Sequence, residues 1–88
     1  MIDFELYRIF VEVAKERNIT KASEKLNVSQ PAITKQIKNL EEQLSMKLLE
    51  RKSKGVELTL EGKKLYEKIK KPIEELNTID RQVCKEKV

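Results

Sequence analysis

Residues 18–40 constrain the fold more than any other part of the chain, because the sequence NITKASEKLNVSQPAITKQIKNL describes two helices joined by a tight turn. Thr20 is suited to cap a short helix that ends near Leu26, since its hydroxyl accepts a bond from a free backbone N–H. Asn27 tolerates the backbone angles of a turn, and Val28 supplies an apolar side chain for the corner between the helices. The segment therefore predicts a helix-turn-helix.

The second of these helices, expected over residues 29–44, has two different faces. Ser29 caps its start, and Pro31 lies in the first turn, where the missing N–H is harmless. Apolar residues recur at intervals of four, three and four and form a buried face: Ile33, Ile37, Leu40 and Leu44. The opposite face carries amide, hydroxyl and ammonium groups: Gln30, Thr34, Lys35 and Lys38. These groups cluster at the N-terminal end, the end that recognition helices bring to DNA base edges, so a merely solvated surface is the weaker interpretation.

The flanking segments complete a small domain. Residues 3–17 form an amphipathic helix that Asp3 can cap. After Met46 the period changes, and a turn signal at residues 53–55 separates two short stretches with strand character. We expect a two-stranded hairpin over residues 48–58 that leans on the helices, because an isolated hairpin is marginally stable. The expected fold is mainly α: a winged helix-turn-helix with a three-helix core and a two-stranded wing.

Thr59 can cap a last, long helix that runs from Leu60 toward the C-terminus. It carries an apolar seam with a heptad component: Leu65, Ile69, Ile73, Leu76, Ile79 and Val83. A domain this small does not need so long a helix to close its core, so the seam predicts a homodimer. Pro72 either bends or breaks this helix. We therefore divide the chain into a DNA-binding unit over residues 1–59 and a linker and dimerisation helix over residues 60–88.

Composition supports a nucleic-acid partner and argues against an enzyme. The net charge is +4, and the excess of lysine and arginine is concentrated in residues 19–40 and 47–58. The chain has no histidine and a single cysteine, Cys84, so it offers no imidazole base, no metal-ligand set and no intrachain disulfide. It also has no glycine-rich phosphate loop, and we expect no cofactor. No apolar run approaches the ~20 residues of a membrane span, so we expect no membrane association and a cytoplasmic location.

Several of these motifs, taken together, resemble the N-terminal DNA-binding domain of LysR-type transcriptional regulators. The resemblance runs from about Phe10 to Gly62. It rests on Ser-Gln-Pro-Ala at residues 29–32, Leu-Glu at 40–41, Leu-x-x-x-Leu-Leu-x-Arg at 44–51 and Leu-Thr-x-x-Gly at 58–62. The family implies a winged helix-turn-helix followed by a long linker helix that pairs with that of a second copy. In full-length members a ligand-sensing domain follows, so any effector is expected only in a C-terminal domain absent here.

The resemblance also implies roles for individual residues. Positions that approach bases match Gln30, Pro31, Thr34 and Lys35. Positions that contact the phosphate backbone match Thr20, Lys21 and Arg51. From the residue chemistry we add further phosphate contacts: Ser29, whose helix start offers free N–H groups, and Lys38, Lys52 and Lys54. Gln30 is the first candidate for direct readout, since glutamine pairs bidentately with adenine in the major groove.

Two other functions remain open from the sequence. Winged helices also serve as protein-interaction modules, and the apolar seam is compatible with a unit that chiefly dimerises. A different regulator family with a similar N-terminal domain, the molybdate-responsive type, would keep DNA binding but change the missing C-terminal part. The sequence specifies neither the operator nor the effector, and it does not distinguish an activator from a repressor.

Overall fold

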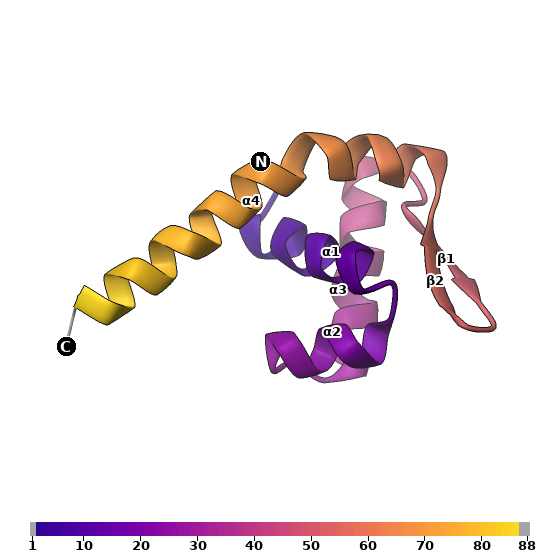
Figure 1. The fold of residues 1–88 in the computed structure, drawn as a ribbon. Helices are drawn as coiled ribbons and strands as arrows, with labels where there is room; N and C mark the ends of the chain where they lie inside the picture. Colours follow the sequence, from indigo (N-terminus) through magenta and orange to yellow (C-terminus); the bar gives the residue numbers. More distant parts are fainter. Residues whose placement is uncertain (1, 87–88) are drawn as a thin grey trace.

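The computed structural model describes residues 2–86, with side chains up to Val83, so the predicted properties of Cys84 and the end of the 60–88 segment lie outside the described residues. The chain forms α1 (Phe4–Glu16), α2 (Ile19–Leu26), α3 (Gln30–Leu44), β1 (Leu49–Lys52), β2 (Gly55–Leu58) and α4 (Leu60–Glu86). In Figure 1, α1 to α3 form a compact body, the β1–β2 hairpin projects from one side, and the end of α4 extends away from the opposite side. The predicted winged helix-turn-helix with a long C-terminal helix is confirmed.

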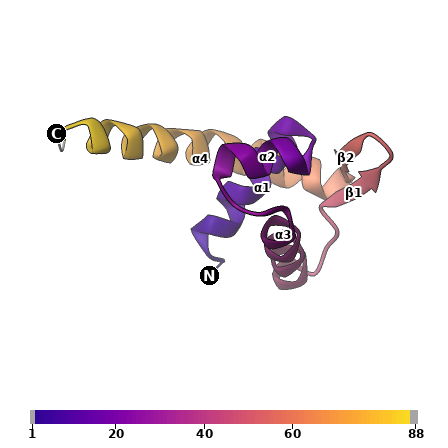
Figure 2. The same cartoon turned by 90° about the horizontal axis from the view of Figure 1, so that it is seen from below.

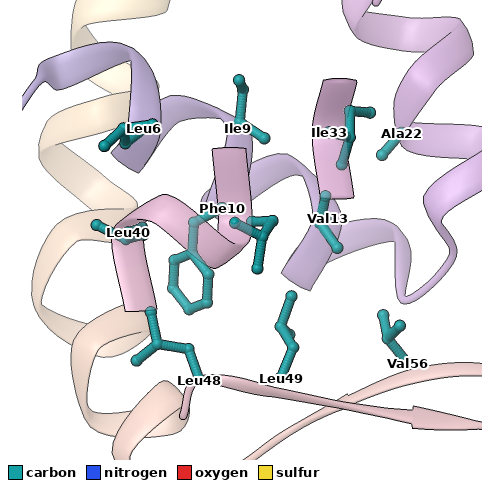
Figure 3. Packing of buried hydrophobic residues seen from close by; sticks show 11 residues of the cluster. Leu6, Ile9, Phe10, Val13, Ala22, Ile33, Leu40, Leu48, Leu49 and Val56 are labelled. Carbon is teal, nitrogen blue, oxygen red and sulfur yellow. The ribbon is translucent and has the colours of Figure 1, made fainter. Parts of the chain in front are cut away.

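The apolar face of α1 forms the centre of the core. Asp3 caps this helix by accepting a hydrogen bond from the backbone N–H of Glu5 at 2.9 Å, as predicted. Phe10 and Val13 are fully buried and lie among side chains from α2, α3 and the hairpin (Figure 3). Burial of apolar side chains from all of these elements joins them into one packed body.

The cap of α2 is Asn18, and the prediction that Thr20 caps this helix is wrong. The side-chain oxygen of Asn18 accepts a hydrogen bond from the N–H of Lys21 at 2.9 Å. Starting the helix at Ile19 places Ile19, Ala22 and Leu26 on one face, and all three pack against the core. Thr20 is therefore an exposed residue within the first turn.

The turn after α2 and the second helix of the helix-turn-helix, α3, follow the prediction. Asn27 adopts a left-handed conformation with φ 56°, which ends α2. The hydroxyl of Ser29 accepts a hydrogen bond from the N–H of Ala32 at 3.3 Å, and Pro31 lies in the first turn of α3. Ile33, Ile37 and Leu40 are buried, while Leu44 is partly buried against the same core. The polar face of α3 is thereby left exposed on the side away from α1.

The wing is an antiparallel hairpin that two earlier segments hold in place. Its register pairs Leu49 with Leu58 and Lys52 with Gly55. At its root, the carboxylate of Glu41 on α3 accepts hydrogen bonds from the N–H groups of Leu48 and Leu49, at 2.7 and 3.2 Å. Nearer the tip, the carbonyl of Arg17 accepts the N–H of Val56 at 3.1 Å. Leu48, Leu49 and Val56 all belong to the buried cluster (Figure 3), so the hairpin leans on the helices as expected.

The long helix α4 begins as predicted and passes through its proline without a break. The hydroxyl of Thr59 accepts a hydrogen bond from the N–H of Gly62 at 3.0 Å and donates one to the carbonyl of Lys47 at 2.6 Å. Pro72 lies inside the helix, which changes direction part-way along its length (Figure 1). A proline removes one backbone hydrogen bond and crowds the preceding turn, so of the two predicted outcomes the bend is observed.

Packing divides the predicted seam of α4 into two parts. Leu65 and Ile69 pack against the core of the same chain, and Ile73 is only 4% exposed. Leu76, Ile79 and Val83 are 43%, 51% and 56% exposed, on the half of α4 that extends away from the body (Figure 2). The assignment of Ile73 to a dimer contact is therefore corrected, because its side chain is buried in its own domain. Leu65 and Ile69 are only partly buried there, and their part in a dimer contact remains a prediction. The domain division after residue 59 remains a prediction. In the structure, the first half of α4 packs against the core formed by the preceding elements.

None of the helices in the described part of the chain combines the length and the apolar character needed to cross a bilayer.

Candidate nucleic-acid interface

The exposed face of α3 and the wing form a shallow depression between them. The residues that line it are Ile19, Gln30, Pro31, Thr34, Lys35, Lys38 and Arg51. This set contains all four residues predicted to read bases, together with two predicted to contact phosphates. The structure thus brings the polar groups of α3 and the wing arginine to a single surface.

A second depression adjoins the first, between the start of α2 and the wing. Its lining residues are Asn18, Ile19, Thr20, Gln30, Arg51, Lys52, Ser53, Lys54, Gly55 and Val56. Because Gln30 and Arg51 line both depressions, the two form one continuous surface from α3 to the wing tip. Thr20, Lys52 and Lys54, all predicted to contact phosphates, lie along its edge.

Two predicted contact residues line neither depression, namely Lys21 and Ser29. The N–H of Lys21 already donates to the Asn18 side chain, and the hydroxyl of Ser29 accepts the N–H of Ala32. The cap of each helix thus occupies one backbone N–H group of its first turn, including one at the start of α3 that was expected to be free for phosphate. Both side chains are exposed beside the surface, and their role in phosphate contact remains a prediction.

The electrostatics of this surface favour an anion. The first depression contains Lys35, Lys38 and Arg51, no carboxylate lines it, and none of the three cations forms an ion pair with another described residue. On the wing, Lys52 lies 3.5 Å from the carboxylate of Glu50, which neutralises part of its charge. The depression between α3 and the wing therefore holds three cations without an acidic partner in the described part of the chain, an arrangement that attracts an anion.

One basic residue of the helix-turn-helix is directed away from this surface. The ammonium of Lys25 lies 2.6 Å from the carboxylate of Glu16. This hydrogen bond lowers the pKa of Glu16 below its usual value and raises that of Lys25. The contribution of the pair to stability is therefore present at neutral pH and is lost as the pH falls through the lowered pKa of Glu16. Lys25 thus holds α2 to the end of α1.

Sequence reasoning missed the contacts that connect α3 to the wing. The guanidinium Nη2 of Arg51 donates a hydrogen bond to the hydroxyl of Thr34 at 3.0 Å. Glu41, on the same side of α3, accepts hydrogen bonds from the backbone at the wing root. In the sequence, the Leu40–Glu41 pair had contributed only to the family resemblance. Both contacts depend on how the hairpin packs, and no local sequence signal reports that packing.

A family comparison decides which of the candidate regulator families applies. The sequence pattern of the family described as "Bacterial regulatory helix-turn-helix protein, lysR family" matches residues 4–63. The chain belongs to the lysR family. This family's domain contains the helix-turn-helix, the wing and the start of α4, and it is a DNA-binding domain of transcriptional regulators. The family match therefore sets aside the molybdate-responsive alternative.

Curated relatives of this lysR-family domain are transcriptional regulators. The regulator BenM of Acinetobacter baylyi is 43% identical over 76 residues, which cover 86% of this chain and 24% of BenM. The regulator BudR of Klebsiella aerogenes is 44% identical over 66 residues, which cover 75% of this chain and 46% of BudR. The chain thus spans less than half the length of these relatives.

Solved structures of lysR-family domains share this fold. The DNA-binding domain of BenM in complex with catB site 1 DNA superposes with a TM-score of 0.77 at 40% identity, covering 98% of this chain and 92% of that one. The CbnR DNA-binding domain in its DNA complex gives a TM-score of 0.79 at 32% identity, covering 99% of this chain and all of that one.

Proposed function

We propose that this lysR-family domain binds a dyad-symmetric DNA site as a homodimer, with α3 of each protomer in the major groove. The observation that carries the proposal is the convergence of Gln30, Pro31, Thr34 and Lys35 with Arg51 on one cation-lined surface. A protruding helix start with amide and hydroxyl groups fits base edges, and the flanking cations fit phosphates. The DNA complexes of BenM and CbnR support the same assignment.

Each part of the surface has a proposed role. Gln30, Pro31, Thr34 and Lys35 approach base edges, while Lys38, Arg51, Lys52 and Lys54 neutralise phosphates on either side, with Thr20, Lys21 and Ser29 at the margin. The domain regulates transcription in the cytoplasm and carries no catalytic group. Any effector binds to a further domain, as the greater length of the relatives suggests.

Substitutions of Gln30 and Lys38 distinguish base reading from phosphate binding. Gln30→Ala removes a side chain that pairs with adenine, so we expect discrimination at one base pair of each half-site to fall by about 1–3 kcal/mol with little change in salt dependence. Lys38→Ala removes one phosphate contact from each protomer and two from the dimer, so affinity for all duplexes falls alike and the magnitude of the slope of log K against log salt decreases by about 2. Fluorescence-anisotropy titrations of a selected duplex and its base-pair variants measure both. The opposite pattern would show that the two roles are reversed.

The exposed half of α4 carries the proposed dimer contact. Leu76, Ile79 and Val83 recur at three and four residues, the spacing of a coiled-coil seam. The double substitution Leu76→Ser and Ile79→Ser removes apolar area from both copies, so we expect the dimer dissociation constant to rise by about 100-fold or more. Sedimentation equilibrium measures it.

A matched control uses the face of α4 that lines a cleft against α1 and α2. Asn77→Ser with Arg81→Ser changes two residues of that cleft on the same half of the helix. The control should leave the dimer dissociation constant within a few-fold of the original value. A monomeric unsubstituted domain at high concentration, or equal effects of both double substitutions, would contradict a dimer formed through this seam.

A further inference from the structure

The hydrogen bond between Arg51 and Thr34 joins the wing to the surface that faces the bases. Leu49 is buried, and Arg51, two residues further along β1, lies on the same face of the hairpin, toward α3. Thr34 lies one helical turn after Gln30 and one before Lys38, on the exposed side of α3. The two side chains meet at 3.0 Å although they are 17 positions apart in sequence.

The wing root fixes this meeting independently of Arg51. Glu41 lies two turns after Thr34 on α3, and its carboxylate holds the N–H groups of Leu48 and Leu49. Thr34, Lys38 and Glu41 all line the side of α3 that faces Leu49, Arg51 and Val56. The position of Arg51 relative to α3 is thus set by contacts that remain when the arginine is changed.

The bond determines what the Thr34 hydroxyl can do. A threonine hydroxyl has one proton to donate and can accept bonds through two lone pairs. In a helix it often donates to a carbonyl one turn earlier, as Thr78 does to Glu74 at 3.0 Å. A guanidinium can only donate, so Thr34 accepts from Arg51 and its own proton remains available to an acceptor in the groove.

We propose that Arg51 is a positioning residue for base reading, which orients the Thr34 hydroxyl as a donor toward a base acceptor while its other N–H groups hold a phosphate. The acceptors that such a donor recognises in the major groove are guanine N7 and O6, adenine N7 and thymine O4. Arg51 thereby couples phosphate binding by the wing to base recognition by α3. The inference rests on the proposed function, since it concerns the same surface.

The test compares single and double substitutions at the two positions. The probes are a duplex selected by the unsubstituted domain from a random library and its single-base-pair variants. Thr34→Val removes the hydroxyl, and Arg51→Lys keeps the charge but loses the fork of donors. We expect each to lower discrimination at the same base pair by about two- to tenfold per half-site. The double variant should be no worse than Thr34→Val alone, and Thr34→Ser should retain discrimination.

Controls distinguish positioning from a general effect. Thr78→Val and Arg8→Lys make the same chemical changes on α4 and α1, away from this surface, and should leave base preference unchanged. Because Arg51→Lys keeps the charge, the salt slope and the thermal midpoint should also stay unchanged.

Three results would overturn the inference. Base preferences that are unaltered in Arg51→Lys while all duplexes bind more weakly would make Arg51 a phosphate contact alone. Effects that multiply in the double variant, or that fall at different base pairs, would show that the two residues act separately. If the unsubstituted domain showed no base preference, the proposed function would fail first and the inference with it.

Discussion

Raising the salt concentration from 50 to 200 mM should lower the affinity of this domain for duplex DNA by about 10³- to 10⁵-fold. The two adjoining depressions present five cationic side chains per protomer: Lys35, Lys38, Arg51, Lys52 and Lys54. A homodimer doubles that number, which is enough to neutralise about six to ten phosphates and release their counterions. The measurement is a fluorescence-anisotropy titration of one duplex at several salt concentrations and fixed pH.

The salt prediction also separates DNA binding from a protein-docking role. A winged helix that serves a protein partner would bind duplexes weakly, with a shallow slope of log K against log salt. As a control, Lys25→Ala removes a cation that pairs with Glu16 away from the surface, so it should leave the slope unchanged. A slope that responds equally to Lys25→Ala and Lys38→Ala would contradict the placement of the interface.

Gly62→Ala should destabilise the domain, although alanine ordinarily stabilises a helix relative to glycine by about 0.5–1 kcal/mol. Gly62 is buried at the start of α4, and a Cβ there would overlap the backbone carbonyl oxygen of Leu48. The Leu48 backbone cannot move away easily, because two hydrogen bonds fix it. The Glu41 carboxylate accepts the N–H of Leu48, and the carbonyl of Leu48 accepts the N–H of Thr59 at 3.0 Å. The clash therefore displaces the helix start or the wing root.

The expected cost of Gly62→Ala is about 1–3 kcal/mol, the usual range for overpacking. For a domain of this size it corresponds to a fall of roughly 5–20 °C in thermal midpoint, measured by circular dichroism at fixed protein concentration. Lys64→Ala, at an exposed position in the same turn, is the control and should change stability by less than about 0.5 kcal/mol. A midpoint that rises in Gly62→Ala would show that α4 does not approach Leu48 so closely.

The sequence predicts local features of this domain well, because their causes are local. The interval of four and three residues in α3 produces the buried face of Ile33, Ile37 and Leu40 whatever the neighbouring elements do. Ser29, Pro31 and Asn27 act within a few residues of their own positions, and each has the predicted role. The same helical period places Gln30, Thr34, Lys35 and Lys38 on one exposed face, so their shared surface was also predictable, whereas the base-reading role of Pro31 came only from the family resemblance.

Features that depend on packing were not predictable in the same way. Asn18 and Thr20 are both good caps, and only the burial of Ile19 and Ala22 selects Asn18. The apolar residues of α4 form one uniform seam in the sequence, but the path of the helix across α1 places Ile73 inside and leaves Leu76 exposed. Partners 17 positions apart, such as Arg51 and Thr34, are brought together only by the register of the wing.

The most direct test of the central claim is selection from a random-sequence duplex library at two salt concentrations, followed by sequencing of the bound fraction. The account predicts salt-sensitive binding that enriches a two-fold symmetric motif, with half-sites one helical turn or a multiple apart. Enrichment should depend on Gln30 and on the exposed α4 residues Leu76 and Ile79. Binding without enrichment, or no binding at 50 mM salt, would contradict a dimeric domain that reads base sequence through α3.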